Sequence, residues 1–549
     1  MYQLFFLLIF SFAFSNGINS QTLDFARRGD QYRVWVYFKD KVDSEKIGIS
    51  QKTNIRRQKS GVVSSYLWLD LKISSTYKTQ IEELGVEIKN ESRWLNAVSV
   101  LCPKATLENI SNLPFIEKIE PVIGYKKPKL VIGEEIEPNS REYDYGNAQA
   151  QIEQINAHEL HNAGYTGENV RILVMDTGFD LTHNVFANIN VIDQWDFIND
   201  DNETANETSN EQSNNQDYHG TAVLSTVAAN TPGEFMGVAF DAEFLLAKTE
   251  DVSQEIQLEE DNYVAGLEWG EANGADVVST SLGYLDWYTY EDLDGNTAVT
   301  TNAIDIAVGL GMVCVTAAGN EGNDDWYYII TPADADSVIA VGAVKDDGEI
   351  ATFSSHGPTY DGRIKPEVCA RGYQTWCINP NSTTTYTRMS GTSLACPLVG
   401  GATALIRQVQ TDWSAMEVRE AMMMTASISS NPDNTYGYGI LNVAAAIEYD
   451  QFTGINDSGV SPSAFHFLSA YPNPFNPAIK INVSSSVGAH LIVDVFSING
   501  KLIDNLYSGI TFQKINKLYW YPQNLSSGVY LIRSRLNNHI LFQKITLIK

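Results

Sequence analysis

The pattern of apolar and polar positions changes character along the chain, which predicts separate folding units. In residues 25–132, strand-like runs at 32–38 (YRVWVYF) and 115–121 (FIEKIEP) flank a short helical stretch at 106–113. Runs rich in β-branched and aromatic residues are typical of strands. We therefore predict a small α/β domain over residues 25–132, followed by a charged, proline-bearing linker at 126–141.

Between residues 145 and 449, short apolar runs alternate with longer helical stretches. The predicted strands are 170–175, 244–247, 277–279, 312–316 and 338–344. The predicted helices are 220–229, 262–273, 302–309, 393–409 and 415–425. This alternation predicts an α/β fold in which helices flank a mostly parallel sheet. The acidic, Asn-rich stretch 199–217 is expected to be a loop.

A linker rich in Gly, Ser and Pro is predicted over residues 450–464, and the pattern after it is different again. Residues 465–549 contain alternating runs at 479–483, 491–496 and 529–534 without an amphipathic helix, which predicts a small all-β sandwich. This segment has eight Lys or Arg residues and only two acidic residues, whereas the whole 549-residue chain has a formal charge of −30. The contrast indicates a separate module.

The first residues and the overall charge restrict the cellular setting. Residues 4–14 (LFFLLIFSFAF) are too short to span a bilayer but suit a signal peptide over residues 1–20, although no Lys or Arg precedes them. A buried N-terminal helix or strand is the alternative. No later run is long enough for a transmembrane segment, and the acidic balance argues against nucleic acid as a partner.

Five cysteines are too few for a disulfide framework in a chain of this length. Cys314 lies in an apolar run, and Cys396 follows a serine motif, so both are expected to be small buried residues. Cys369 and Cys377 are close in sequence with a glycine between them, and we predict a disulfide between these two.

Three short motifs, far apart in the chain, carry the candidate chemistry. They are Val174–Gly178 (VMDTG), His219–Thr221 (HGT) and Gly391–Pro397 (GTSLACP). A hydroxyl needs an imidazole to accept its proton, and a carboxylate to orient that imidazole, before it becomes a useful nucleophile. Asp176, His219 and Ser393 supply these groups, and the chain order Asp, His, Ser is that of the subtilisin triad.

Each motif alone has a simpler interpretation. Asp-Thr-Gly can be an ordinary strand-to-turn junction; it is also the aspartic-peptidase triplet, but that chemistry needs two carboxylates and no second triplet occurs. His219 can be a surface or capping residue, and Ser393 can be a helix N-cap, with Pro397 tolerated in the first turn. Asn320 can be a turn residue, or its amide can donate to a developing oxyanion.

Taken together, the motifs of residues 145–449 resemble the subtilisin (subtilase) family of serine peptidases. The resemblance assigns the triad to Asp176, His219 and Ser393 and the oxyanion donor to Asn320. It assigns substrate binding to Ser281, Leu282 and Gly283, which match the strand that pairs with substrate, and to Ala317, Ala318 and Gly319, which match a wall of the S1 pocket. The closing segment 436–443 (YGYGILNV) also matches. Ala222 stands where many relatives have a second histidine, which we expect to alter packing only.

The resemblance implies a secreted serine endopeptidase acting on proteins or peptides without a required cofactor. A catalytically inactive surface-binding pseudopeptidase is the alternative, but no triad member is missing. An esterase would be expected to show Gly-x-Ser-x-Gly, whereas Leu394 and Ala395 follow Ser393. Bulky residues before Thr331, Ile330 among them, stand where many relatives have glycine, which predicts a shortened S1 pocket and small or medium apolar P1 residues.

Both flanking segments carry resemblances of their own. Residues 25–132 are similar to the family's inhibitory propeptide, which implies self-cleavage between about 122 and 145. Residues 465–549 resemble the sorting domain of type IX secretion through YPNPFNP (471–477), VDVFSINGK (493–501) and SSGVYLI (526–532). This implies export through the periplasm of a Gram-negative bacterium to the surface or medium; a carbohydrate- or protein-binding sandwich is the alternative.

Structural calcium often stabilises this family, so two acidic segments are candidates for it. Residues 199–217 and 291–296 offer oxygen ligands, but neither matches a full ligand pattern. Solvated loops are therefore the alternative, and we assign no metal ligand.

Overall fold

The computed structural model describes residues 26–59, 68–122, 143–252, 260–285 and 288–449, together with the strands and parts of the connections within 466–547. The chain forms two compact units, residues 1–449 and 450–549. The predicted signal peptide, the linker 450–464 and nearly all of the stretch expected to be self-cleaved lie outside the described residues.

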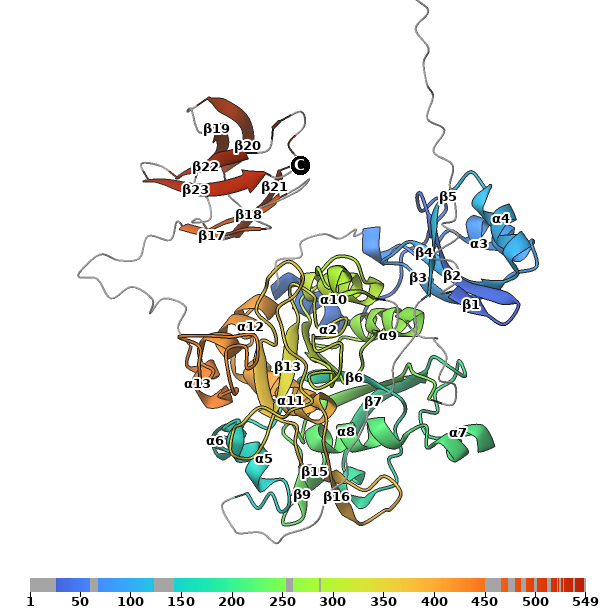
Figure 1. Cartoon of the computed structure of the whole chain (residues 1–549), viewed down its shortest axis with the longest axis vertical. Coiled ribbons are helices and arrows are strands. Elements are labelled where there is room, and N and C mark those ends of the chain that lie inside the picture. The colour runs from blue at the N-terminus through green and yellow to red at the C-terminus, as the bar shows by residue number, and fades with distance from the viewer. Residues whose placement is uncertain are drawn as a thin grey trace, which may run out of the picture. The chain divides into compact units, whose positions relative to one another are not determined.

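An antiparallel sheet forms the first part of the larger unit (Figure 1). Its strands run in the order β1, β2, β4, β3, and β5 pairs with the part of β2 that β1 leaves uncovered. The strands are β1 (Arg27–Arg28), β2 (Gln31–Phe38), β3 (Glu87–Ser92), β4 (Ala97–Cys102) and β5 (Ile116–Pro121). Helices α2 (Gln51–Lys59), α3 (Ser75–Glu82) and α4 (Lys104–Ser111) and the 3₁₀ turn η2 (Trp68–Asp70) connect these strands.

Strand β2 is buried on both faces, which is why its apolar run is continuous. Val34, Val36 and Phe38 join a core with residues of α3 and α4. Trp35 and Tyr37 point the other way, as alternate residues of a strand must, and join the core of the next domain. The small domain therefore has its own core but also packs against the domain that follows.

The sheet of the second part has seven strands, all parallel, in the order β14-β13-β12-β11-β6-β10-β7. The strands are β6 (Arg171–Asp176), β7 (Asn190–Asp196), β10 (Glu243–Lys248), β11 (Val277–Thr280), β12 (Val313–Ala317), β13 (Ile339–Val344) and β14 (Val368–Arg371). The five predicted strands are all among them, and the predicted α/β class with a mostly parallel sheet is confirmed.

Helices cover this sheet on both faces. On β6, Leu173 and Met175 lie against Gly270 and Gly266 of α9 (Glu260–Ala272), whereas Asp176 lies against the start of α8. The other helices are α5 (Gln149–Gln154), α6 (Ala157–Asn162), α8 (Tyr218–Ala228), α10 (Val299–Gly309), α11 (Thr392–Val409), α12 (Ala415–Met424) and α13 (Val443–Ile447). Strands buried on both faces read as continuous apolar runs, as the sequence indicated.

Short elements complete the unit, and one of them corrects a prediction. The stretch 199–217 is not entirely a loop, because α7 (Ser209–Asn214) forms inside it behind a capping box of Thr208 and Glu211. The remaining pieces are the pairs β8 (Asn230–Thr231) with β9 (Phe235–Met236) and β15 (Thr375–Ile378) with β16 (Tyr386–Met389), and the turns η3 (Asn184–Phe186) and η4 (Tyr290–Asp292).

The second unit consists of strands throughout its described part, as predicted. One sheet has the order β17-β18-β21 and the other β20-β19-β22-β23, and every pairing is antiparallel. Alternate residues of β18 and β19 fill one shared core. The strands are β17 (His466–Tyr471), β18 (Ile479–Ser484), β19 (His490–Ser497), β20 (Leu502–Ile510), β21 (Ile515–Trp520), β22 (Gly528–Leu536) and β23 (His539–Leu547).

No helix in the described ranges is both long and apolar enough to cross a membrane.

Candidate active site

Asp176 and His219 meet at the carboxyl edge of the seven-stranded sheet. Asp176 is the last residue of β6 and is fully buried, and His219 lies in the first turn of α8 with 8% of its surface exposed. The Nδ1 atom of His219 lies 2.7 Å from Oδ1 of Asp176. A Cβ on Gly220 would lie 3.0 Å from Cβ of Asp176 and 2.2 Å from the carbonyl oxygen of Gly178, so only glycine allows α8 to start this close to β6.

Ser393 and Asn320 meet around Gly391. A Cβ placed on Gly391 would lie 2.7 Å from Oγ of Ser393 and 3.6 Å from Nδ2 of Asn320. Oδ1 of Asn320 accepts hydrogen bonds from the backbone N–H of Thr392 (2.8 Å) and from its hydroxyl (3.0 Å). The amide oxygen is thereby fixed, which leaves the NH₂ group to face the region beside the serine hydroxyl.

One residue of each pair lies on a helix, His219 on α8 and Ser393 on α11. Helices α8 and α11 are in contact. Ala222, three residues after His219, shares a small apolar cluster with Leu394, the residue after Ser393, and with Cys377 and Met389. Ala222 is thus a buried packing residue in this chain.

One polar atom on each residue of the candidate triad has no hydrogen-bond partner. Oγ of Ser393, Nε2 of His219 and Oδ2 of Asp176 are all buried and unpaired. The structure therefore contains the carboxylate–imidazole hydrogen bond but no hydrogen bond from Ser393 to His219. Buried polar groups are nearly always paired, so an unpaired atom on each of the three candidate residues calls for an explanation. Catalytic hydrogen bonds are often long or unformed when no substrate is bound.

Pro397 does not lie where the sequence predicted, and its position explains a contact between Ser281 and the helix that carries Ser393. Pro397 lies in the second turn of α11, not the first, and it has no N–H to donate to the carbonyl oxygen of Ser393 four residues earlier. The hydroxyl of Ser281 donates to that oxygen instead, at 2.8 Å. The segment after β11 is thus attached to the residue that carries the candidate nucleophile.

The residues expected to bind substrate lie together with Ile330. Ser281–Gly283 follow β11, and Ala317–Gly319 end and follow β12, its neighbour in the sheet. A Cβ on Gly283 would lie 2.3 Å from Cδ1 of Ile330, and one on Gly319 would lie 3.1 Å from its Cγ1. The backbone N–H of Ile330 donates to the carbonyl oxygen of Ala318 at 3.1 Å. The Ile330 side chain therefore occupies the space between these two segments.

A carboxylate cluster lies at the end of β7. Oxygens of Asp196, Asp201 and Glu207 lie within 4.8 Å of one another. The Lys248 ammonium contacts Asp196 at 2.8 Å and Glu211 at 2.6 Å. Burial raises the pKa of Asp196 despite this lysine, and desolvation together with the Asp201 charge raises the pKa of Glu207.

Oxygen donors of this kind fit calcium, and one lysine does not balance the cluster's charge. The second candidate segment fits less well. Oδ2 of Asp292 accepts from Thr289, and the carboxylate of Asp294 accepts from residues 296 and 297. In 291–296 these two carboxylates therefore cap local turns.

The predicted disulfide between Cys369 and Cys377 is wrong. Both are free and buried, as are the other three cysteines. Cys369 lies on β14 of the main sheet, and its thiol donates to the carbonyl oxygen of Tyr436 at 3.4 Å. Cys377 lies on the separate β15 and faces Thr387 at 3.8 Å. Closeness in sequence failed as a guide because the turn between them sends the two strands into different sheets. Burial raises the pKa of each thiol.

Thr392 is the site residue that sequence reasoning missed. It is part of the serine motif, but its two hydrogen bonds to Asn320 orient the candidate oxyanion donor. The sequence contained a signal for this role, because Thr392 directly precedes Ser393 at the start of a predicted helix. A hydroxyl in that position can form a hydrogen bond to a neighbouring loop.

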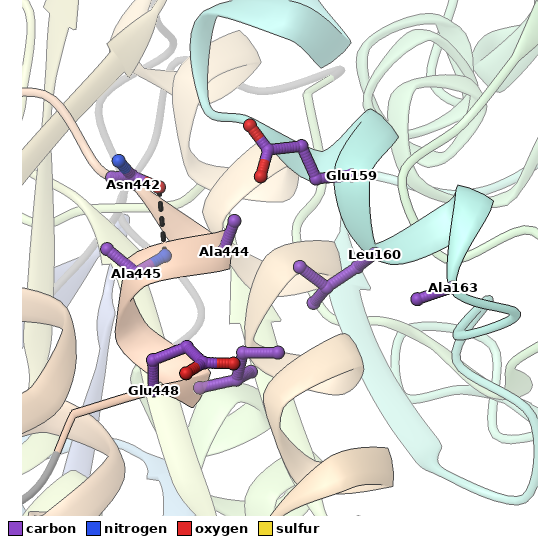
Figure 2. Close-up of a pocket in the computed structure, with 8 residues that line it drawn as sticks. Glu159, Leu160, Ala163, Asn442, Ala444, Ala445 and Glu448 are labelled. Carbon is purple, nitrogen blue, oxygen red and sulfur yellow. Dashed lines mark hydrogen bonds between the residues drawn. The ribbon is translucent and has the colours of Figure 1, made fainter.

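A cavity of about 500 Å³ lies elsewhere, between α6 and α13. Figure 2 shows Leu160 of α6 beside Ala444 of α13, with Asn442 bonded to the backbone of Ala445 at the start of the helix. None of the residues that line it belongs to the candidate site.

Comparisons with known proteins match three segments of the chain to families. Residues 167–439 match the subtilase family, residues 33–133 match a peptidase S8 propeptide domain of Bacteroidota, and residues 469–549 match a secretion system C-terminal sorting domain. Subtilisin E of Bacillus subtilis is 32% identical over 377 residues, which cover 68% of this chain and 87% of that protein. Subtilisin DY of Bacillus licheniformis is 36% identical over 297 residues, 54% of this chain and 96% of the relative. An alkaline protease of Shouchella clausii is 30% identical over 366 residues, 66% and 83% of the two chains. The chain belongs to the subtilase family of serine endopeptidases.

Proposed function

We propose that this subtilase hydrolyses peptide bonds through Asp176, His219 and Ser393. Asp176 holds the imidazole of His219 with its proton on Nδ1, which leaves Nε2 free to accept the proton of Ser393. The serine oxygen then attacks the peptide carbonyl, and the imidazolium returns the proton to the leaving amine. The observation that carries this proposal is the 2.7 Å contact between Asp176 and His219 beside two buried atoms, His219 Nε2 and Ser393 Oγ, that have no partner.

Asn320 and the start of α11 stabilise the oxyanion in this scheme. The Nδ2 group of Asn320 and the Ser393 hydroxyl both lie close to Gly391, and the first N–H groups of a helix have no partner within the helix. In subtilisin, removing such a donor costs about 3–4 kcal/mol of transition-state stabilisation, and we expect a cost of the same order here. No cofactor takes part in these steps.

The substrates are proteins or peptides with a small or medium apolar residue at P1. The Ile330 side chain fills space between the segments 281–283 and 317–319, which we assign to substrate binding. A shortened pocket accepts a valine- or alanine-sized side chain and excludes a long one by overlap.

The chain is made as a precursor that processes itself. In this proposal residues 1–20 direct export, residues 25–132 are the inhibitory propeptide, residues 145–449 are the peptidase, residues 450–464 are a linker, and residues 465–549 are recognised by the type IX secretion machinery after passage through the periplasm. Self-cleavage falls between about 122 and 145.

One experiment tests activity and processing together. The wild-type chain and Ser393→Ala are expressed, their N-termini are sequenced, and casein hydrolysis is measured. The wild type is expected to begin within 122–145 and to hydrolyse casein, whereas Ser393→Ala accumulates as precursor. Normal processing of Ser393→Ala would contradict self-cleavage, and a folded wild type without hydrolysis would favour a binding protein.

A further inference from the structure

Helix α2 (Gln51–Lys59) is buried although it has almost no apolar residue. Its sequence is QKTNIRRQK, and its one large apolar side chain, Ile55, is 47% exposed. Thr53, Arg56 and Arg57 are the buried residues. Burying two guanidinium groups is costly unless both are paired, so the helix must have a specific acidic or carbonyl-rich partner.

That partner is the C-terminal end of α9 in the peptidase domain. The backbone N–H of Ser50 donates to the carbonyl oxygen of Ala272 at 3.0 Å, and the Thr53 hydroxyl donates to that of Glu271 at 2.7 Å. Arg56 donates to the carbonyl oxygen of Ala275 just beyond the helix. The last carbonyl groups of a helix lack partners within it and carry partial negative charge, so a basic helix suits this position.

Glu271 is the central charge of this contact. It is fully buried, and its carboxylate accepts from Arg56 at 2.6 Å and from Arg57 at 2.9 Å. Arg57 also pairs with Asp70 of its own domain at 2.9 Å. Arg93 of the N-terminal domain joins this network, at 3.3 Å from Glu268 and 3.4 Å from Glu271. Three guanidinium groups therefore face three carboxylates, and the buried charges balance.

The contact extends along the amino edge of the seven-stranded sheet. Lys52 lies 3.3 Å from Glu243, the first residue of β10, and 3.2 Å from Asp276, just before β11. A Cβ on Gly274 would lie 2.8 Å from Oγ of Ser50, so the two surfaces touch directly. In Figure 1, α2 lies apart from the sheet of its own domain. Nε of Arg56 also donates to the carbonyl oxygen of Leu310, at the end of α10, at 3.4 Å. This edge is opposite to the one that carries Asp176.

The propeptide sheet contacts the other end of the same helix. Asp261, in the first turn of α9, accepts from Arg33 at 2.6 Å and from Ser99 at 2.6 Å. The N-terminal domain therefore holds α9 at both ends, through the sheet at its start and through α2 at its end.

We propose that α2 is a second anchor between the propeptide and the peptidase domain, separate from the candidate active site, and that it determines how long the cut propeptide stays bound. This rests on the proposed function, in which residues 25–132 become a separate chain. The surface of the peptidase that receives the anchor consists of Glu271, Asp276, Glu243 and the carbonyl groups that end α9, and its partner is the chain's own basic helix.

The test measures release without using the enzyme's own activity. A recognition sequence for a sequence-specific protease is inserted between residues 126 and 141 of the full Ser393→Ala chain, which is then cut, and dissociation of the propeptide is followed by size exclusion over time. Arg56→Met and Glu271→Gln are compared singly and together, with Lys72→Met as a control, since Lys72 pairs with Glu45 at the propeptide surface.

Arg56→Met is expected to release the propeptide at least about 30-fold faster, because removing one partner of a buried charge pair acts mainly on dissociation. The double variant should release the propeptide no faster than the single variant that releases it faster, because the double variant leaves neither partner of the pair unpaired. Lys52→Gln, a partly exposed member of the anchor, should act in the same direction with a smaller effect that fades in high salt.

A folded Arg56→Met chain that keeps its propeptide as long as the control would overturn the proposal. If Arg56→Met does not fold, unchanged release by both Glu271→Gln and Lys52→Gln would overturn it equally. Failure of self-cleavage in the chain that retains Ser393 would contradict the proposed function but leave this measurement unaffected.

Discussion

The candidate active site and the amino edge of the seven-stranded sheet treat their polar groups in opposite ways. In the candidate active site, Ser393 Oγ, His219 Nε2 and Asp176 Oδ2 are buried without partners. At the amino edge, Glu271 and Lys52 contact opposite charges across the domain boundary. Unpaired groups are costly and persist where chemistry needs them, whereas a balanced network serves attachment. The candidate catalytic residues and the proposed propeptide anchor therefore differ in whether their polar groups are paired.

The largest effect is expected at Asp176. Asp176→Asn keeps the size of the side chain but removes the acceptor that fixes the His219 tautomer, and we expect kcat to fall by about 10⁴ with the fold retained. Steady-state kinetics on a peptide substrate, with circular dichroism as a check on folding, measures this. A loss below tenfold would mean that the buried contact is structural and that the comparison fails.

Asn320 comes next. Asn320→Ala should lower kcat by about 10²–10³ and leave KM nearly unchanged, because the lost amide acts only on the transition state. Thr392→Val is the matched variant. It keeps the shape but removes one hydrogen bond to Asn320, so a smaller decrease in kcat is expected. If KM rises instead while kcat holds, Asn320 binds the ground state and is not the oxyanion donor.

A second buried histidine, His161, leads to a prediction for how folding stability depends on pH. Both ring nitrogens of His161 are paired, with the Tyr145 hydroxyl at 2.9 Å and the carbonyl oxygen of Val238 at 2.8 Å. Burial lowers the pKa of His161 to about 4. The unfolded chain then binds more protons between about pH 6.5 and 4, so stability falls as pH decreases through this window, by about 3 kcal/mol in total.

Denaturant unfolding of the Ser393→Ala chain from pH 7 to 4 tests this, with His161→Gln as comparison. The variant should be less stable at pH 7 but should lose less on acidification. An unchanged slope would show that His161 does not control the acid response. His219→Gln, which removes a histidine with one free nitrogen, should abolish activity at every pH.

A smaller effect is expected at Ile330, which should change the P1 preference through the shape of the S1 pocket and leave the catalytic groups intact. Ile330→Gly should lengthen S1, so that kcat/KM for a P1 phenylalanine peptide rises about 10–100-fold relative to a P1 alanine peptide, the range that one or two buried methylenes supply. A peptide library measures the preference. A wild-type preference for Arg or Lys at P1, or an unchanged profile in the variant, would show that Ile330 does not shorten the S1 pocket.

The smallest effect concerns the carboxylates at the end of β7. If calcium binds Asp196, Asp201 and Glu207, chelation should lower Tm by a few degrees, with about 1 kcal/mol lost. Asp201→Asn should reduce that chelator response, whereas Asp294→Asn, in the turn that caps itself, should leave it intact. Equal Tm values with and without chelator would mean that these carboxylates bind no calcium.

The sequence predicted the parts of the fold that depend on long apolar runs. Strands β6, β10 and β12 were recognisable because strands covered on both faces are continuously apolar. Edge strand β7 was missed because polar residues interrupt it, and α7 was missed although Thr208 and Glu211 form a readable capping pair. Helix α2 could not be predicted from periodicity, because its burial depends on charges of another domain.

The site was predictable to the level of residue identity but not of geometry. The three motifs and Asn320 placed the candidate side chains at strand ends and helix starts, where the structure has them. The Ser281 bond to the Ser393 carbonyl depends on Pro397 lying one turn deeper in the helix, which no local pattern specifies. The cysteine pair failed for a related reason, because sheet membership is decided by pairing with distant strands.

The most direct test of the account is covalent labelling of Ser393 by a fluorophosphonate. We predict a single adduct, mapped to Ser393 by peptide mass analysis, that disappears in Ser393→Ala and forms far more slowly in His219→Ala. A folded, propeptide-free protein that is not labelled, or one labelled equally fast without the imidazole, would contradict the assignment of these residues as one catalytic unit.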